Sequence, residues 1–242
     1  NFKLLFSANA NYPRVHLTNI SKENPSNPPV FCMILRKYLL GGRILDVLFH
    51  DFERILTFNI ESVNELGDLS VKKLIIEIMG RHSNIILVNE NGKIIDSIKH
   101  VDSDMSRVRE VMPAREYVLP PAQDKISPLG LDIDILIENS ALSELNIEKY
   151  LLNNIKGFSP FICKEVCFCA GISGKSPASE ISKNEILVSH LKSALHEIIQ
   201  KIKYKDYRSC IIYEEYGPSK KNVLDFHCLP IRSEERRVGK EC

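Results

Sequence analysis

The chain has 242 residues, 44% of them hydrophobic and 26% charged, and its formal net charge is +1 at pH 7. This composition is typical of a globular protein with a sizeable core. The net charge gives no sign of nucleic-acid binding through overall positive charge, so any such role would rest on local basic patches. The sequence contains no run of about 20 apolar residues that would predict a membrane helix. It also shows no signal peptide that would predict secretion. Seven cysteines at irregular spacing favour a reducing compartment, so we expect a cytoplasmic protein without a membrane partner.

The first hundred residues are expected to form an antiparallel sheet built from hairpins. Apolar residues recur there with a period close to two, which predicts strands. Asn91-Gly92 marks one turn strongly because both residues tolerate positive φ, and Gly41-Gly42 marks the end of a helix. The expected strands are 2–7, 14–18, 43–49, 54–60, 71–78, 84–89 and 93–98, with helices at 30–40 and 105–113.

From residue 132 onward the apolar period becomes helical. The expected helices are 133–139, 143–155, 160–170 and 182–203, followed by a hairpin of strands 209–215 and 223–229 around Gly217. A capping-box-like segment at 179–182, with Glu185 three residues after Ser182, sets the expected start of the last helix. The fold class is therefore α+β, with a β-rich domain over residues 1–128 and a helical region plus terminal hairpin over residues 129–231.

Both ends of the sequence suggest a fragment. The chain starts on Asn1 rather than Met, within a strand-like run. Residues 232–242 read as the translation of a sequencing adapter, with a genuine charged tail as the alternative. We therefore expect this last segment to be extended and not to pack against the fold.

Three cysteines, Cys163, Cys167 and Cys169, lie close together in an expected helix. The first two share a helix face but the third does not, and the second Cys-x-x-Cys pair of a zinc site is absent. Packing of small apolar side chains is the simpler interpretation. Ser83 beside His82 likewise lacks a third, orienting group. We therefore expect no metal, no cofactor and no catalytic residue.

Gly157, Phe158 and Ser159 form a short link between two expected helices, just before Pro160. A glycine turn that points the N-terminal amides of a helix outward can bind a phosphate of a nucleic-acid backbone. A plain turn between two helices has the same spacing. The sequence leaves both interpretations open.

Basic residues form two local groups. Clusters of this kind are usually solvated surfaces, but they can also follow a phosphate backbone. One group flanks the Gly41-Gly42 turn and consists of Arg36, Lys37 and Arg43. The other comes from the loops of the strands expected at 71–98 and from the segment after them. Its members are Arg81, His82, Lys99, His100, Arg107, Arg109 and Arg115.

Three long motifs together resemble one known family. Residues 31–44, 76–88 and 119–128 are similar, in this order, to the NFACT proteins, and Gly157 to Pro160 falls where that family has a helix-hairpin-helix. The likeness runs from about residue 2 to residue 231. Bacterial members of the family are known as fibronectin-binding proteins or as ribosome quality-control factors.

The resemblance implies a non-enzymatic RNA-binding protein. Such proteins recognise peptidyl-tRNA on the large ribosomal subunit of a stalled ribosome and recruit alanyl-tRNA for untemplated tailing of the nascent chain. An Asp-Arg pair of the family touches tRNA, and Glu53-Arg54 stands at the matching position, its acid one methylene longer. Arg54 is expected at the tip of a hairpin, and the basic side chains of nearby loops, Arg81, Lys99 and His100, are expected to complete this tRNA site. The neighbouring Glu53 carboxylate is expected to orient the Arg54 guanidinium.

Two other classes of function stay open. The name fibronectin-binding protein implies a surface adhesin for fibronectin or fibrinogen, although the sequence shows no signal peptide. The family's amino-terminal fold is also similar to that of formamidopyrimidine glycosylases, which implies a DNA-binding enzyme. The extreme amino-terminal residues and the four-cysteine zinc finger of those enzymes are absent from this sequence.

Overall fold

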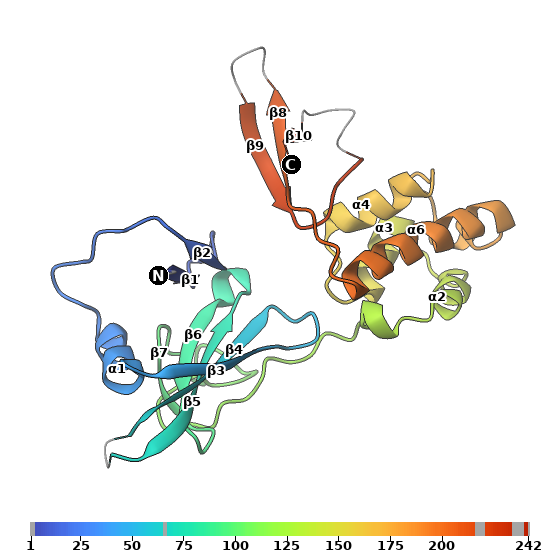
Figure 1. Cartoon of the computed structure of the whole chain (residues 1–242). Coiled ribbons are helices and arrows are strands. Elements are labelled where there is room, and N and C mark those ends of the chain that lie inside the picture. Colours follow the sequence, from blue (N-terminus) through green and yellow to red (C-terminus); the bar gives the residue numbers. More distant parts are fainter. Residues whose placement is uncertain (1–2, 65–66, 216–220, 234–239, 242) are drawn as a thin grey trace. The chain divides into compact units, whose positions relative to one another are not determined.

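The computed structural model describes residues 3–64, 67–215, 221–233 and 240–241. The chain divides into two compact units, Asn1–Ala122 and Gln123–Cys242 (Figure 1). Helices and antiparallel sheets are both present, which confirms the α+β class. Among the described residues, no helix combines the length and the apolar character that crossing a bilayer requires.

The first unit is built on a five-stranded antiparallel meander, as expected from its hairpin signals. Gly92, with φ at 78°, makes the turn before the last strand. Strand order in the sheet follows chain order, and a separate hairpin and one helix precede it. These elements are β1 (Lys3–Ser7), β2 (Arg14–Thr18), α1 (Val30–Leu39), β3 (Arg43–Phe49), β4 (Ile55–Val63), β5 (Leu69–Glu77), β6 (Asn84–Val88) and β7 (Ile94–Ser97).

Both faces of this sheet are buried in its centre. On one face, Phe31 of α1 packs in a cluster with Ile76 and Leu87. On the other face, Ile75 and Ile86 pack with Val111, which lies in the irregular segment after β7. Alternate residues of a strand point to opposite faces, so one strand supplies both clusters.

The helix expected at 105–113 is not formed, and this prediction was wrong. Val101 and Val111 pair instead as an antiparallel bridge, with N···O distances of 3.0 and 2.7 Å in the two directions. The Asp102 carboxylate accepts hydrogen bonds from the N–H groups of Asp104 and Met105, a local turn that competes with helix formation. Burial of Val111 against the sheet therefore wins over helical propensity.

The second unit packs its helices around one apolar core, with Leu151, Val166 and Leu195 fully buried. The helices are α2 (Ile133–Ser140), α3 (Ile147–Asn154), α4 (Pro160–Cys169), α5 (Ala178–Ile181) and α6 (Glu185–Lys203). The expected start of α6 was wrong, because Asn184 rather than Ser182 caps it. The Asn184 side chain accepts from the N–H groups of Ile186 and Leu187.

Burial explains the cysteines of α4. It raises the pKa of the Cys163 and Cys167 thiols to about 12, so both stay protonated and pack as apolar groups. No cluster of three or more His, Cys, Asp or Glu side chains suited to a metal ion occurs within the described part of the chain.

The expected terminal hairpin is present as β8 (Cys210–Glu215) and β9 (Lys221–His227), and its turn lies outside the described residues. Contrary to expectation, the described part of 232–242 makes specific contacts. The Glu165 carboxylate accepts from the N–H groups of Arg232 and Ser233 at 2.9–3.0 Å, and β10 (Lys240–Glu241) pairs with β8. The origin of this segment in an adapter stays a prediction.

Candidate functional site

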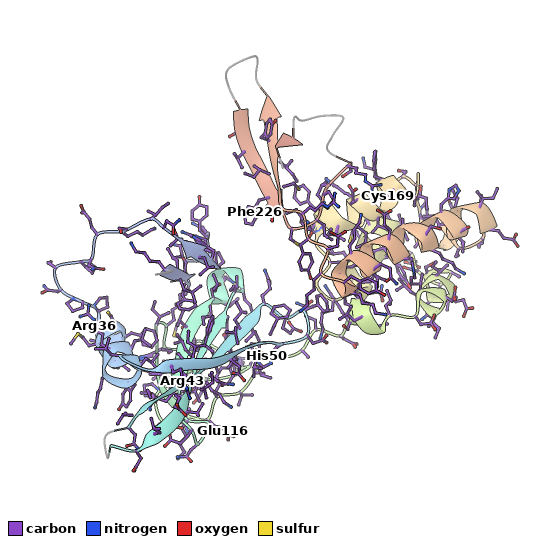
Figure 2. The ribbon with its side chains drawn as sticks, viewed as in Figure 1. Arg36, Arg43, His50, Glu116, Cys169 and Phe226 are labelled. Atoms are coloured by element: carbon purple, nitrogen blue, oxygen red, sulfur yellow. The ribbon has the colours of Figure 1, made fainter. Side chains whose placement is uncertain are left out.

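The loop between β3 and β4 holds the Glu53-Arg54 pair and has a constrained backbone. Asp51 and Phe52 adopt positive φ values of 27° and 57°, which non-glycine residues rarely do. The N–H of Glu53 donates to the carbonyl of His50 at 2.6 Å, and the rings of Phe49 and Phe52 meet edge to face at 6.3 Å. Figure 2 labels His50 at the start of this loop. Backbone strain of this kind concentrates at functional sites.

Arg54 presents its side chain to solvent from this loop. It is exposed and forms no ion pair or side-chain hydrogen bond with any described residue. Its carbonyl accepts from the N–H of Ile78 at 2.8 Å, which fixes the loop beside the end of β5. Glu53 is half-buried and does not pair with Arg54, so the expected orienting contact is not formed. The guanidinium of Arg54 is available to a ligand.

Arg81 and His82 lie in the turn that follows β5, a single 3-10 turn over Gly80–His82. Gly80 has a φ of 56°, and the buried Ser83 hydroxyl accepts from the N–H of Met79 at 2.8 Å. Both basic side chains are exposed, and Arg81 Nε donates to His82 Nε2 at 2.9 Å. The turn is therefore well anchored while its two basic side chains face outward.

Lys99 and His100 follow β7 and reach the same place. The buried Asn84 side chain accepts from the N–H of Lys99 at 3.0 Å and donates to its carbonyl at 2.8 Å. Lys99 Nζ lies 3.4 Å from the carbonyl of Arg81, and His100 Nε2 lies 2.6 Å from Asp96 Oδ1. The structure thus joins loops that are 18 residues apart in sequence.

These four predicted residues line one pocket of about 600 Å³. Glu53, Arg54, Arg36, Lys37 and Arg43 are not among its lining residues. Arg36 is exposed on α1, and Arg43 forms a surface ion pair with Glu61 at 3.0 Å (Figure 2). The first basic group of the sequence therefore belongs to another part of the unit.

One charged group that lines the pocket, Glu77, was not among the residues predicted from the sequence. Glu77, at the end of β5, is fully buried and forms an ion pair with Arg109 and a 2.9 Å hydrogen bond from the Tyr117 hydroxyl. Arg109 also donates to the carbonyl of Val118 at 2.8 Å. The sequence did carry a signal for this group: a carboxylate at the end of an apolar strand is expected to be buried, and a buried charge needs a partner.

The electrostatics of this trio follow from burial and the Glu77 charge. Burial and then the negative charge of Glu77 raise the pKa of Tyr117, so the phenol stays protonated and donates. Burial alone would lower the pKa of Arg109, but the hydrogen bond and charge of Glu77 raise it overall. The trio ties the segment after β7 onto the end of β5.

In the second unit, Gly157 is exposed with a φ of 77°, as expected for the turn between α3 and α4. No described residue accepts from the N–H groups of Gly157 and Phe158. The Phe158 side chain is buried in the core, so only its backbone can meet a ligand. The Ser159 hydroxyl caps α4 by accepting from the N–H of Ile162 at 3.4 Å.

Comparison with known proteins adds to this geometry. Residues 1–240 match the family described as NFACT N-terminal and middle domains. The chain belongs to the NFACT family. It is 46% identical over 176 residues to the Rqc2 homolog RqcH of Bacillus subtilis, which covers 72% of this chain and 31% of that protein. It is 32% identical over 217 residues to the Rqc2 homolog RqcH of Streptococcus pneumoniae, 89% of this chain and 35% of that protein.

Solved structures of related proteins have the same fold. The fibrinogen binding protein from Staphylococcus aureus aligns with a TM-score of 0.72 at 29% identity, covering 99% of this chain and 79% of that one. The N-terminal part of the fibronectin/fibrinogen-binding protein from Streptococcus suis aligns with a TM-score of 0.69 at 31% identity, covering 96% and 76%. The chain spans about a third of the length of the curated relatives that it matches.

Proposed function

We propose that this NFACT chain is a non-enzymatic binding part of a cytoplasmic ribosome quality-control factor, with tRNA and the large ribosomal subunit as its partners. One observation carries the proposal: Arg81, His82, Lys99 and His100 converge on one pocket. Arg54 lies on the adjacent strained loop. Two loops that present cations on rigid strands suit a phosphate backbone.

The relatives named Rqc2 homolog RqcH support the ribosomal role. In detail, we propose that the factor recognises peptidyl-tRNA on a split large subunit and recruits alanyl-tRNA for untemplated tailing. Within this scheme Arg54 contacts tRNA, and the rim of the pocket continues that contact. The chain then supplies binding energy and orientation rather than bond chemistry.

Direct binding tests this proposal. The 242-residue chain is expected to retain tRNA on filters and to co-sediment with isolated large ribosomal subunits. Both signals should saturate and should weaken as salt rises, because the contacts release counterions from phosphates. A chain that captures neither tRNA nor large subunits would contradict the proposal.

Ser159 offers a test of the Gly157–Ser159 turn with two variants that match in shape and differ in charge. Ser159→Asp and Ser159→Asn both keep a good helix cap, so the melting temperature should stay close to that of the parent chain. The new carboxylate should repel an approaching phosphate, and Ser159→Asp should weaken RNA retention several-fold while Ser159→Asn does not. Equal retention by the two variants would leave the turn with a structural role only.

Binding to a matrix protein is the second candidate, because solved relatives carry the names fibrinogen binding and fibronectin/fibrinogen-binding protein. Strand β3 is at an edge of the sheet and exposes Ile44, Val47 and Phe49. Exposed edge strands can pair with an extended segment of a partner. Immobilised fibronectin distinguishes the candidates: saturable capture of the chain that excess tRNA does not displace would favour this second function.

A further inference from the structure

A second buried carboxylate lies in the other unit of the chain, and its partners differ from those of Glu77. Glu165, in the middle of α4, is 2% exposed. Its two oxygens accept from the N–H of Arg232 at 3.0 and 2.9 Å and from the N–H of Ser233 at 2.9 Å. The Cys169 thiol, labelled in Figure 2, donates to the same carboxylate at 3.5 Å. No basic side chain of the described residues donates to it, so its main partners are two peptide N–H groups.

These donors suit a carboxylate that has been removed from water. A buried charge needs hydrogen bonds, and consecutive N–H groups form a small concave site for an anion. Hydrogen bonds to an ionised group are also stronger than those between neutral groups. Burial, and then the negative charge of Glu165, raise the pKa of Cys169 to about 11. The thiol therefore stays protonated near neutral pH and adds a donor to the site.

The segment that carries the two N–H groups is held on the helical core just before them. Leu229 is 3% exposed and Ile231 is fully buried, and both belong to the core cluster of the second unit. The Leu229 carbonyl accepts from the Cys210 thiol at 3.3 Å. Pro230, between the two apolar residues, has no N–H to offer. Apolar burial thus brings the chain to α4, and Glu165 receives the next two N–H groups.

The side chains at these two positions contribute little to the contact. The Arg232 guanidinium pairs with Glu197 of α6 at 2.8 Å, where the two side chains are 48% and 42% exposed. An exposed ion pair of this kind contributes little stability. The Ser233 hydroxyl is buried and has no hydrogen-bond partner among the described residues, which is unfavourable. The site therefore fits the main chain better than it fits these two side chains.

We infer that Glu165 forms a main-chain binding site on α4, which takes a pair of consecutive peptide N–H groups from the segment after β9. Every residue except proline carries such a group, so the site holds the chain beyond β9 whatever its side chains are. The site lies in the second unit and does not depend on the proposed binding of RNA.

Hydrogen–deuterium exchange of the Arg232 and Ser233 amides in the full chain measures this contact. In the parent chain both amides should exchange at least about tenfold more slowly than in an unfolded peptide of the same sequence. Glu165→Gln keeps the shape but removes the charge and one acceptor, so both rates should rise several-fold. Glu165→Ala should raise them further. Ser233→Pro removes one donor without touching the core, and the Arg232 amide should lose its protection while the melting temperature stays near that of the parent chain.

Three variants separate main-chain binding from side-chain pairing. Arg232→Ala and Glu197→Gln remove only the exposed ion pair, so exchange of the two amides should stay at the parent rate. Ser233→Ala removes the unpaired hydroxyl and should leave the exchange unchanged or slower. If Arg232→Ala exposed the amides as much as Glu165→Gln does, the ion pair would hold the segment and the inference would fail. Full protection of the Arg232 amide in the Ser233→Pro chain would also overturn it.

Discussion

Replacing Arg54 by alanine is expected to weaken tRNA binding by about 1–3 kcal/mol, roughly 5- to 150-fold in the dissociation constant, while the melting temperature stays unchanged. The guanidinium is exposed and has no side-chain partner among the described residues, so its removal leaves no buried group unpaired. The strained loop that carries Arg54 is fixed in place because the N–H of Ile78 donates to the Arg54 carbonyl at 2.8 Å. Filter binding of tRNA measures the effect.

Three variants serve as controls for this result. Arg54→Lys keeps the charge but loses the planar fork of donors, so it should recover only part of the affinity. Glu53→Asp should be tolerated, because it restores the acid usual in the family. Arg43→Ala removes a cation outside the pocket and should leave tRNA binding near the parent value. Unchanged capture of tRNA by the Arg54→Ala chain would reduce Arg54 to a solvated surface residue.

The sheet could be predicted from sequence because its signals are local. Alternating apolar residues and the Asn91-Gly92 turn specify strands and a hairpin without knowledge of the rest of the chain. The segment after β7 could not be predicted in this way. Its conformation depends on Val111 packing against the sheet and on the Asp102 side chain capturing nearby N–H groups, which a helical pattern does not reveal.

The candidate site likewise has a part that local sequence signals predict and a part that they do not. Arg81, His82, Lys99 and His100 could be identified because each follows a predicted strand within a few residues. The pocket itself depends on contacts between distant residues: Glu77 meets Arg109 at a separation of 32 residues and Tyr117 at 40. No periodicity encodes such pairs. The cap of α6 shows a smaller failure, because Ser182 and Asn184 are both residues that favour a helix cap and the helix begins after Asn184.

Glu77→Ala is expected to destabilise the first unit by about 3–5 kcal/mol, a large part of the stability of an ordinary domain. The carboxylate is fully buried, and its removal leaves the largely buried Arg109 guanidinium and the Tyr117 hydroxyl without their partner. An uncompensated buried charge is the costliest outcome for this site. Thermal and urea unfolding of the chain measure the loss.

The Arg43–Glu61 ion pair provides the matched comparison within the same unit. Arg43 is 75% exposed in its side chain, so Arg43→Ala should cost at most about 1 kcal/mol. Glu77→Gln tests the charge separately, because the amide keeps the shape and can still accept from Tyr117 but no longer neutralises Arg109. It should destabilise less than Glu77→Ala and more than Arg43→Ala. If Glu77→Ala costs no more than Arg43→Ala, the buried trio does not hold the segment after β7 on the sheet, and the walls of the pocket must be fixed by apolar packing of Val101 and Val111 alone.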